Sequence, residues 1–339
     1  MPTILAIESS CDETSASVCS DGIIRSNIIA TQKVHEQYGG VVPELASRAH
    51  MQNIVPVVDA ALKNANCTLN DIDAFAFTQS PGLIGALLVG GQFAKSLALA
   101  CNKPLIGVHH MQAHVVANLI ENPKPSFPFL CLTVSGGHTQ IVLCESPLQM
   151  KVVGQTIDDA AGEAFDKIAR IMGLGFPGGP VIDKAASDGN KDAILFPRGL
   201  TQSADLEAHR YDFSFSGLKT AVSRYLKQTP NHLKADVAAS FQEAVVDVLI
   251  SKSIAACKDS GIDNLVIAGG VAANSRLREL AKQRCEVAKI ALRIPPAGLC
   301  TDNGAMVAAL GSLAINEGVK PSQTGIPADS AASIAQVIW

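Results

Sequence analysis

Aromatic side chains are scarce in this chain of 339 residues: they make up 4% of the sequence, and Trp339 is the only tryptophan. Apolar residues nevertheless account for 47%. The core must therefore be filled by aliphatic side chains, a composition that is typical of strands buried between helices. The length predicts two domains, since domains commonly contain roughly 100–200 residues.

An excess of positive charge is also lacking, because the formal net charge is -4. The chain as a whole has no field that would attract nucleic acid, so any RNA contact needs a local patch or a partner protein. Candidate cations are grouped at Lys219, Arg224 and Lys227, and at Arg276 and Arg278. The simpler interpretation of each group is an ordinary solvated helix face.

Cysteine pairs of the CxxC type, a P-loop and a Rossmann glycine fingerprint are absent from the sequence. The nine cysteines are scattered, and Cys131 and Cys144 lie in apolar, strand-like runs. This pattern favours a reduced, intracellular protein. No apolar run approaches the roughly 20 residues of a membrane span, and no signal-peptide pattern follows Met1. We therefore expect a soluble, cytoplasmic protein.

A strand–turn–strand pattern occurs twice. The apolar residues 4–7 precede the polar turn ESSCDET and an alternating run, and further along FLCLTV precedes SGGHT and QIVLC. Ile4 then aligns with Leu130 and Cys19 with Cys144, at an offset of about 125 residues. The recurrence predicts an internal duplication.

Strands and helices alternate along both halves of the chain, which predicts α/β layers. The expected strands include 73–78, 104–108 and 265–268, and the expected helices are 44–65, 82–100, 110–120, 233–258 and 274–283. The proline-rich stretch 122–128 is the best boundary. It gives domains 1–122 and 123–339, with the C-terminal helix able to pack back on the first domain.

Two histidines, His110 and His114, are spaced i, i+4 on a predicted helix. This spacing puts both imidazoles on one face with Cβ atoms about 5–6 Å apart, so they can share a metal ion. A merely polar face is an equally simple interpretation. Zinc proteases use such a pair in the pattern HExxH. Here the sequence is HMQAH, which lacks the glutamate that acts as general base.

A third metal ligand is offered by Asp302, in the segment CTDNGAM before a small-residue helix. The alternative role for this residue is the N-cap of that helix, where Asp is favoured. Two histidines and one carboxylate with open positions suit Fe(II), and Zn(II) also fits. The open positions would accept phosphate or carbonyl oxygens.

Three Gly-Gly pairs lie next to apolar runs. They are Gly136-Gly137, Gly178-Gly179 and Gly269-Gly270. Paired glycines let backbone N–H groups approach a phosphate closely, although tight turns need glycine as well. The segment Val134 to His138 is the strongest of the three, because Ser135 and His138 add side-chain donors at a strand end, where α/β sheets bind ligands. Asn274, after the third pair, can bind a base or ribose or merely cap its helix.

Acidic residues occur in two further places. Asp159, Glu163 and Asp166 fall near one face of a predicted helix, where a carboxylate can accept both hydroxyls of a ribose; a solvated face is the simpler alternative. Asp12 and Glu13 lie in the first turn of the duplicated pattern. They are candidates for orienting a metal-bound water or for taking a proton from a nucleophile.

The motifs ESSCDETS, YGGVVPELASRAH, HHMQAH, VSGGHTQ, DDAAGEAFDK, FPGGP, FSFSGLKT and CTDNGAM extend from residue 8 to about 306. Together they resemble those of the bacterial tRNA N6-adenosine threonylcarbamoyltransferase (TsaD) family. The resemblance implies an α/β fold of two actin-like (ASKHA, ribonuclease H-like) domains, as in sugar kinases and Hsp70, with nucleotide and metal bound in the cleft between them.

The resemblance also implies a reaction, the transfer of a threonylcarbamoyl group from threonylcarbamoyl-AMP to N6 of adenosine 37 in tRNAs that read codons beginning with A. It places one divalent metal, Fe2+ with Zn2+ or Mg2+ as alternatives, on His110, His114 and Asp302, and an adenine nucleotide as substrate or product. Catalytic roles fall on Asp12 and Glu13. The implied substrate-binding residues are Val134, Ser135, Gly136, Gly137, His138, Asp166, Gly179, Asp183 and Asn274.

The partners implied by the resemblance are tRNA, threonylcarbamoyl-AMP, a paralogous actin-like protein (TsaB type), an ATPase (TsaE type) and the enzyme that makes the adenylate (TsaC type). No membrane is implied. Gln112-Ala113 stand where the family is expected to have Glu-Gly, Ala272 stands where Ser is common, and residues past about 320 match no motif. Two other functions stay open from the residues alone: a metal-dependent glycoprotein endopeptidase and a regulatory ATP-binding protein of the actin-like class.

Overall fold

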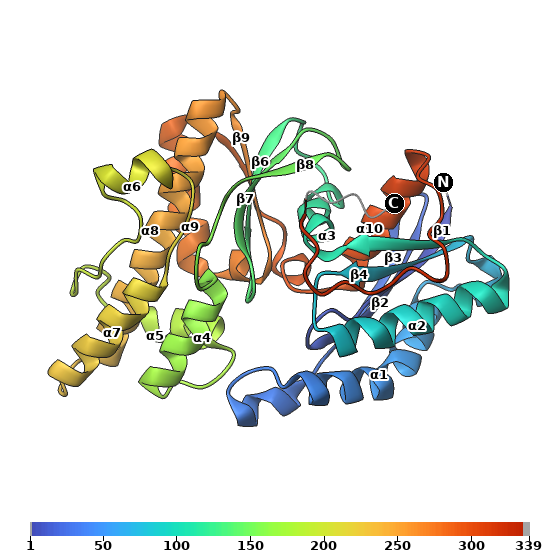
Figure 1. The fold of residues 1–339 in the computed structure, drawn as a ribbon, viewed down its shortest axis with the longest axis horizontal. Helices are drawn as coiled ribbons and strands as arrows, with labels where there is room; N and C mark the ends of the chain where they lie inside the picture. Colours follow the sequence, from blue (N-terminus) through green and yellow to red (C-terminus); the bar gives the residue numbers. More distant parts are fainter. Residues whose placement is uncertain (1, 335–339) are drawn as a thin grey trace. The chain divides into compact units, whose positions relative to one another are not determined.

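The computed structural model describes residues 2–334, which divide into two compact units (Figure 1). Unit 1 contains the chain up to Lys124, the short segment Ser146–Met150 and the residues from Thr301 onward. Unit 2 contains Pro125–Glu145 and Lys151–Cys300. The chain thus returns to unit 1 for its last helix.

Unit 1 is built on a five-stranded sheet in the order β3-β2-β1-β4-β5. The strands are β1 Thr3–Glu8, β2 Glu13–Ser20, β3 Ile23–Thr31, β4 Ala74–Ser80 and β5 Leu105–His109. Helices α1 (Pro43–Asn64) and α2 (Ile84–Cys101) cover one face, and α3 (His110–Val116) and α10 (Gly304–Asn316) lie on the other (Figure 1). Both faces of β1 and β4 are consequently buried, which explains the apolar runs at residues 4–7 and 74–77.

Unit 2 repeats this plan with the sheet order β10-β9-β6-β7-β8. Its strands are β6 Phe129–Val134, β7 Thr139–Cys144, β8 Met150–Gln155, β9 Asn264–Ala268 and β10 Ala291–Arg293. Its helices are α4 Ala161–Met172, α5 Gly178–Ala186, α6 Ser203–Ala208, α7 Ser216–Gln228, α8 Lys234–Ser260 and α9 Ser275–Ala288. The long helix α8 packs against β6 and β9 and supplies much of the core of this unit.

The duplication predicted from the two hairpins is visible in the strand pairing. In each sheet an antiparallel hairpin, β1-β2 or β6-β7, is followed by parallel pairing of its first strand with a later one, β4 or β9. The alignment of Cys19 with Cys144 is displaced by one residue, since Cys19 pairs with Ile4 whereas Cys144 pairs with Phe129. The pairing next to the turn explains this shift: Glu8 pairs with Ser15 across six intervening residues, whereas Val134 pairs with Thr139 across four.

Most of the expected elements are confirmed, with errors at their ends. Helix α3 ends at Val116 and continues as a 3-10 turn, Ala117–Leu119, rather than as one helix to residue 120. Helix α9 runs five residues beyond the predicted end at residue 283, to Ala288. Strands β3 and β8 had not been predicted, because β3 alternates irregularly and β8 is half exposed.

The residues after 320, which matched no motif, cover the free edge of β5. The backbone N–H of Ser322 donates to the carbonyl of Leu105 at 2.7 Å, and the N–H of Gly107 donates to the Ser322 hydroxyl at 3.0 Å. The Lys95 ammonium reaches the carbonyl of Ile326. These contacts satisfy polar groups that a sheet edge would otherwise leave unpaired.

Within residues 2–334, α2 is long and apolar enough to cross a membrane by length and composition, with a mean hydropathy of 1.5 over 18 residues. The sequence predicted this helix at 82–100, but the expectation that no apolar run approaches the length of a membrane span was wrong. Its small residues, however, press it onto the sheet: a Cβ on Gly90 would collide with Ser9, and one on Gly91 would touch the Phe77 ring at 3.2 Å. The helix therefore packs in unit 1 as part of a helical layer.

Candidate functional site

His110, His114 and Asp302 come together in unit 1. The Nε2 atom of His114 lies 2.9 Å from Asp302 Oδ1, and the Nε2 atom of His110 lies 3.5 Å from the same oxygen. One donor atom from each residue lies within 4.8 Å of the others. Two imidazole nitrogens and one carboxylate oxygen that face one point are a suitable ligand set for a divalent metal.

The local sequence explains how these ligands are positioned. Strand β5 ends at His109, whose Nδ1 accepts the backbone N–H of Met111 and so caps α3. The i, i+4 spacing then stacks the rings of His110 and His114 edge to face, with centroids 4.6 Å apart. The helix places both residues on its inner, buried face.

Asp302 does not cap the helix that follows it. Asn303 is the N-cap of α10, and its side-chain oxygen accepts the backbone N–H of Met306 at 3.1 Å. Because Asn303 caps the helix, the carboxylate of Asp302 is free of that role and contacts the two histidines. Gly304 starts the helix against the backbone of Ala16, so close that a Cβ would not fit, and this contact fixes the end of α10 beside β2.

Glu8, which was not predicted as a site residue, contacts one of the candidate metal ligands. It is fully buried at the end of β1, and its Oε2 lies 3.1 Å from Nδ1 of His110. It also accepts the hydroxyl of Thr78 and the backbone N–H of Ser10, each at 2.5 Å. A carboxylate bound to Nδ1 directs Nε2 of the same ring toward the metal position. The available signal was a single glutamate closing an otherwise apolar buried strand.

The charges of Glu8, His110 and Asp302 shift one another's pKa values. Burial alone would lower the pKa of His110, but the carboxylates of Asp302 and Glu8 outweigh it and raise that pKa well above 6.5. Burial alone would raise the pKa of Asp302, but the neighbouring His110 and His114 hold it well below its usual range. Without metal, the site is therefore an imidazolium held between two carboxylates.

Asp12 and Glu13 lie beside this centre, in the turn from β1 to β2. The turn is fixed by His50, whose Nε2 lies 3.0 Å from the carbonyl of Cys11 and whose Nδ1 lies 2.8 Å from the hydroxyl of Thr14. Burial, followed by the charges of Asp302 and Asp12, raises the pKa of Glu13 to about 10. In the metal-free state Glu13 is consequently a protonated carboxyl, which can donate a proton and cannot accept one.

Gln112, between the two histidines, is almost fully buried and donates its amide to the carbonyl of Ile334 at 3.0 Å. His109 makes a similar contact from Nε2 to the carbonyl of Ala332, at 3.1 Å. Backbone carbonyls near the C-terminus thus bind side chains at the start of α3. The position at which HExxH proteases have glutamate is occupied by the buried Met111, whose thioether provides no general base for peptide hydrolysis.

In unit 2, the residues predicted to bind substrate lie around the carboxyl ends of the parallel strands β6 and β9. Gly162, at the start of α4, donates its N–H to the carbonyl of Ser135 at 3.2 Å. Asp166 accepts the N–H of Gly178, at the start of α5, at 2.7 Å. Gly269 packs against the backbone of Val134. These contacts join the loop after β6 to α4, α4 to the start of α5, and the loop after β9 to the end of β6.

Several of these side chains already hold the loops together. Asn274 caps α9 by accepting the N–H of Leu277 at 2.9 Å, and its amide donates to Gln242 at 2.7 Å. Asp183 accepts the N–H and the hydroxyl of Ser275, at 3.1 and 2.7 Å. The structure therefore supports the capping role for Asn274 and ties α5 to α9 through Asp183.

The glycines of the three pairs differ in what surrounds them. A Cβ added to Gly136, Gly137, Gly179 or Gly270 would meet no atom within 4 Å. One added to Gly178 would collide with the backbone of Phe165 and Asp166. The open glycines leave their backbone accessible to a ligand, whereas the enclosed ones are required by packing.

Gly269 and Gly270 provide a direct test of this distinction. Gly269 has a φ of 90° and lies against the backbone of Val134, so Gly269→Ala is expected to lower the free energy of unfolding by about 2–4 kcal/mol. Gly270→Ala, in open space, should change it by less than about 1 kcal/mol. Urea denaturation followed by circular dichroism measures both. Equal losses for the two variants would contradict this assignment.

Solved structures share this fold. One HypF structure, from T. kodakarensis, is similar over 93% of the chain with a TM-score of 0.65 and 12% identity, although the chain spans only 48% of it. The activator of 2-hydroxyisocaproyl-CoA dehydratase from Clostridium difficile, with bound ADPNP, matches over 94% of this chain and 98% of its own, with a TM-score of 0.51 and 15% identity. Fold and site together define a two-unit α/β protein of the actin-like class with a possible His-His-Asp metal site.

The sequence comparisons narrow this class. The family model for TsaD, tRNA N6-adenosine threonylcarbamoyltransferase, matches residues 23–309. Relatives of that name from Clostridium botulinum (strain Hall) and Corynebacterium diphtheriae are 54% and 51% identical, over 95% and 98% of this chain and 94% and 97% of their own. The chain belongs to the family of tRNA N6-adenosine threonylcarbamoyltransferases, which are acyltransferases that modify tRNA. The resemblance found in the motifs is confirmed.

Proposed function

We propose that the chain transfers a threonylcarbamoyl group from threonylcarbamoyl-AMP to N6 of adenosine 37 in tRNAs that read codons beginning with A. Family membership supports the reaction. The structure supports separate roles for the two units, since unit 1 contains the His-His-Asp site and unit 2 contains the open glycine loops.

His110, His114 and Asp302 hold one divalent metal, for which Fe2+ is the first choice because two histidines and one carboxylate with open positions suit it; Zn2+ and Mg2+ are the alternatives. The donor atoms fit such an ion, since they converge and Glu8 orients one of the rings. When bound, the metal supplies Lewis-acid stabilisation of negative charge on carbonyl or phosphate oxygens.

In unit 2, the backbone N–H groups at Gly136, Gly137 and Gly179 bind the phosphate of the adenylate, because these glycines leave room for close approach. The side chains of Ser135, His138 and Asp166 flank these loops, and Asp183 and Asn274 set the position of α5 and α9. The backbone of Val134 lines the end of β6, since its side chain is buried in the core.

The reaction depends more on how the two reactants are positioned than on covalent catalysis. Threonylcarbamoyl-AMP is a mixed anhydride with AMP as a good leaving group, whereas the exocyclic amine of adenine is a weak nucleophile. Donors aimed at the developing charge and fixed orientation of the two reactants lower the barrier. The amine loses a proton as AMP departs, and Asp12 and Glu13, beside the metal ligands, are the candidates for taking it. The charge of Asp302, which helps to raise the pKa of Glu13 without metal, would be offset by a bound cation.

The reaction takes place in the cytoplasm together with a paralogous actin-like protein of the TsaB type, an ATPase of the TsaE type and an adenylate-forming enzyme of the TsaC type. These partners come from the family resemblance. The buried Met111 argues against the endopeptidase alternative, because it stands where HExxH proteases have glutamate and a thioether cannot act as a general base.

The nucleotide loops are tested by two alanine variants that the fold tolerates. Gly137→Ala and Gly179→Ala place a methyl group in open space, so we expect the unfolding midpoint to stay unchanged while the KM for threonylcarbamoyl-AMP rises about 10- to 100-fold, the effect of losing one charge-assisted hydrogen bond. Mass spectrometry of tRNA nucleosides after reaction with the purified partners measures the product.

The matched control is Gly298→Ala, which is equally open but lies outside these loops, and it should behave as wild type. Unchanged kinetics for both loop variants would place the adenylate elsewhere. If wild-type protein with its partners forms no threonylcarbamoyladenosine, the proposed reaction itself is wrong.

A further inference from the structure

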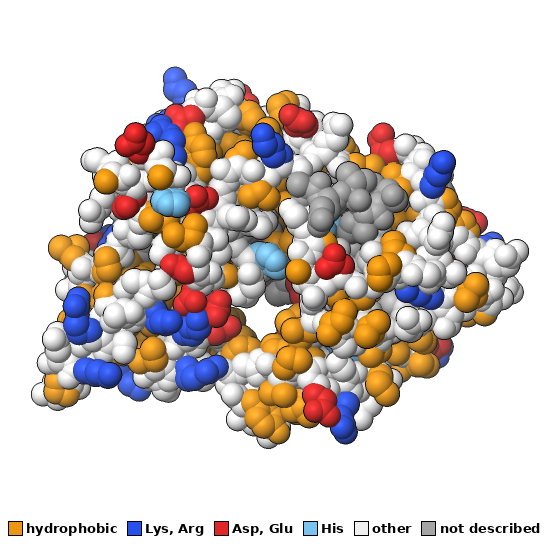
Figure 2. Space-filling model, viewed as in Figure 1, with side chains coloured by type: hydrophobic (Ala, Val, Ile, Leu, Met, Phe, Trp, Pro, Cys, Tyr) orange, Lys and Arg blue, Asp and Glu red, His pale blue; other side chains and the backbone are white. Residues whose placement is uncertain are grey.

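Helix α7 of unit 2 presents a cationic surface that the proposed reaction does not use. The helix contains Lys219, Arg224 and Lys227 and no acidic residue, in a chain whose formal net charge is -4. Lys and Arg side chains gather over the part of the molecule that contains α7, at the lower left of Figure 2. This surface is therefore a positively charged patch on a protein whose net charge is negative.

The cations of α7 are less compensated than those elsewhere in unit 2. Ion pairs with carboxylates hold Arg198, Arg210, Arg276 and Arg284 in this unit. In α7, Lys219 lies 3.4 Å from Asp159, but among residues 2–334 no ion pair is formed by Arg224 or Lys227, and both are exposed. Two positive charges are therefore available to an external anion.

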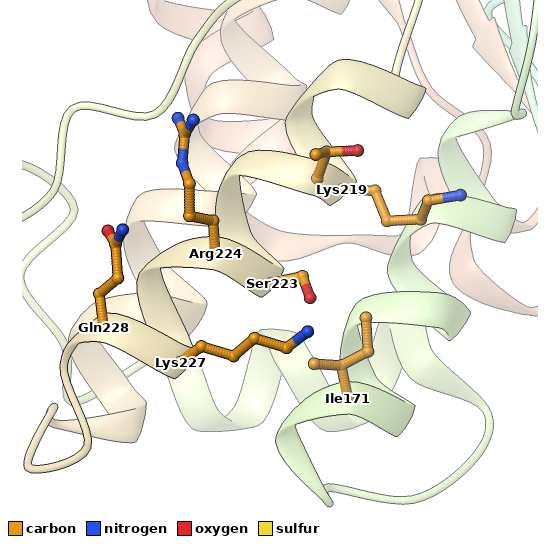
Figure 3. A pocket seen from close by; sticks show the side chains of 7 residues that line it. Ile171, Lys219, Ser223, Arg224, Lys227 and Gln228 are labelled. Atoms are coloured by element: carbon orange, nitrogen blue, oxygen red, sulfur yellow. The ribbon is translucent and has the colours of Figure 1, made fainter.

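These side chains line a pocket of about 470 Å³ between α7 and α4. Lys219, Ser223 and Lys227 follow one another at i, i+4 spacing, and both lysines extend in the same direction in Figure 3, with Ser223 between them. Arg224 rises from the adjacent ridge of the helix. Eight residues of helix correspond to about 12 Å, so the strip is longer than one phosphate group.

We propose that this pocket binds backbone phosphates of the tRNA substrate. Lysine, arginine and serine side chains are the groups that contact phosphates in protein–nucleic acid complexes, where they fix orientation without reading sequence. A negatively charged chain needs such a patch to attract RNA at all. The proposal rests on the proposed function, since it takes tRNA as the substrate, and it extends that function to where the backbone of the substrate is held.

The test compares two double variants that remove equal charge from exposed positions of unit 2. Arg224→Gln/Lys227→Gln removes the two unpaired cations of the pocket. Lys258→Gln/Lys282→Gln is the control on α8 and α9, where neither exposed lysine forms an ion pair within residues 2–334. Fluorescence anisotropy measures binding of labelled, unmodified tRNA by the full chain with its partner proteins between 50 and 200 mM salt, a range of the order over which phosphate contacts dominate.

For the pocket variant we expect tRNA affinity to fall roughly tenfold or more, and the slope of log affinity against log salt to become shallower by about 1.4–1.8, the value for two lost phosphate contacts. The KM for tRNA should rise, while kcat, the KM for threonylcarbamoyl-AMP and the unfolding midpoint stay as in wild type. Arg224→Lys/Lys227→Arg keeps both charges and should restore binding. The control variant should bind tRNA as wild type does.

Three results would overturn the proposal. Unchanged affinity and salt slope in the pocket variant would show that tRNA does not contact α7. Normal tRNA binding with loss of partner assembly would identify the pocket as a docking site for an acidic protein. Tight binding of inorganic phosphate that is lost in the pocket variant, with tRNA binding intact, would make it a small-anion site. Because the assay reads binding, it can fail or succeed independently of whether wild type forms threonylcarbamoyladenosine.

Discussion

Replacing His114 by glutamine is expected to empty the metal site of unit 1 and to reduce formation of threonylcarbamoyladenosine roughly a thousandfold, since a Lewis-acid metal contributes several kcal/mol to such reactions. Within residues 2–334 three protein ligands converge here, and the amide of glutamine is a poor substitute for the buried Nε2 that faces Asp302 at 2.9 Å. Asp302→Asn should have a similar effect, because it removes the anionic ligand of the triad.

Metal content by plasma mass spectrometry and product formation by nucleoside mass spectrometry are measured on the same preparations. His35→Gln is the matched control: His35 is also a fully buried histidine of unit 1, with hydrogen bonds to Gln32 and to the N–H of Val42, but it lies outside the triad. It should retain both metal and activity. A His114→Gln protein that keeps one equivalent of metal would show that the ion binds elsewhere.

The same site should bind metal more tightly as the pH rises. The pKa of His110 is raised well above 6.5 by Asp302 and Glu8 against the effect of burial, so its ring is protonated in the metal-free protein at neutral pH. A metal ion has to displace this proton. Affinity therefore falls as the pH is lowered. Conversely, the stabilisation that protonated His110 gives the metal-free protein is complete below 6.5 and is lost as the pH rises through the raised pKa.

The sequence predicts the fold well where hydrophobic periodicity is strong. The apolar strands β1, β4, β6 and β9 and the long helices α1 and α8 had clear patterns, and the repeat of the hairpins anticipated the common strand order of both sheets. The ends of α3 and α9 and the strand β3 were missed, because tertiary contacts decide them: α3 stops where Val116 and the residues after it turn along α10.

The candidate site was predictable in part. The spacing of His110 and His114 indicated that they can share a metal ion. Asp302, 188 residues from His114, was proposed as the third ligand from its place before a small-residue helix and from the family resemblance, but its contact with His114 is visible only in the fold. Whether Asp302 or Asn303 caps α10 could not be decided from sequence, since both residue types are favoured at N-caps. The C-terminal residues that hold His109 and Gln112 had no motif, because they contribute backbone carbonyls, which any residue can supply.

Glu8→Gln is expected to weaken metal binding about 10- to 100-fold, the effect of losing a carboxylate behind a metal-bound histidine. The substitution preserves shape but changes hydrogen bonding. The three partners of Glu8, Nδ1–H of His110, the hydroxyl of Thr78 and the N–H of Ser10, are all donors. A carboxylate accepts from all three, whereas an amide presents an N–H to one of them. The ring of His110 then loses the partner that fixes its tautomer.

Two companion variants separate positioning from stability. Thr78→Val removes one donor to Glu8 but leaves the Glu8–His110 contact, so it should cost about 1 kcal/mol of unfolding free energy and change metal affinity less than threefold. Glu8→Asp keeps a carboxylate that is one methylene shorter and should retain part of the affinity. Competition with a chelator measures affinity, and 15N NMR of the imidazoles reports the tautomer of His110. If metal affinity falls equally in Glu8→Gln and Thr78→Val, Glu8 acts only through the stability of β1. If the tautomer of His110 is unchanged in Glu8→Gln, another group orients the ring, such as the Ser10 hydroxyl, which lies 3.2 Å from Nδ1.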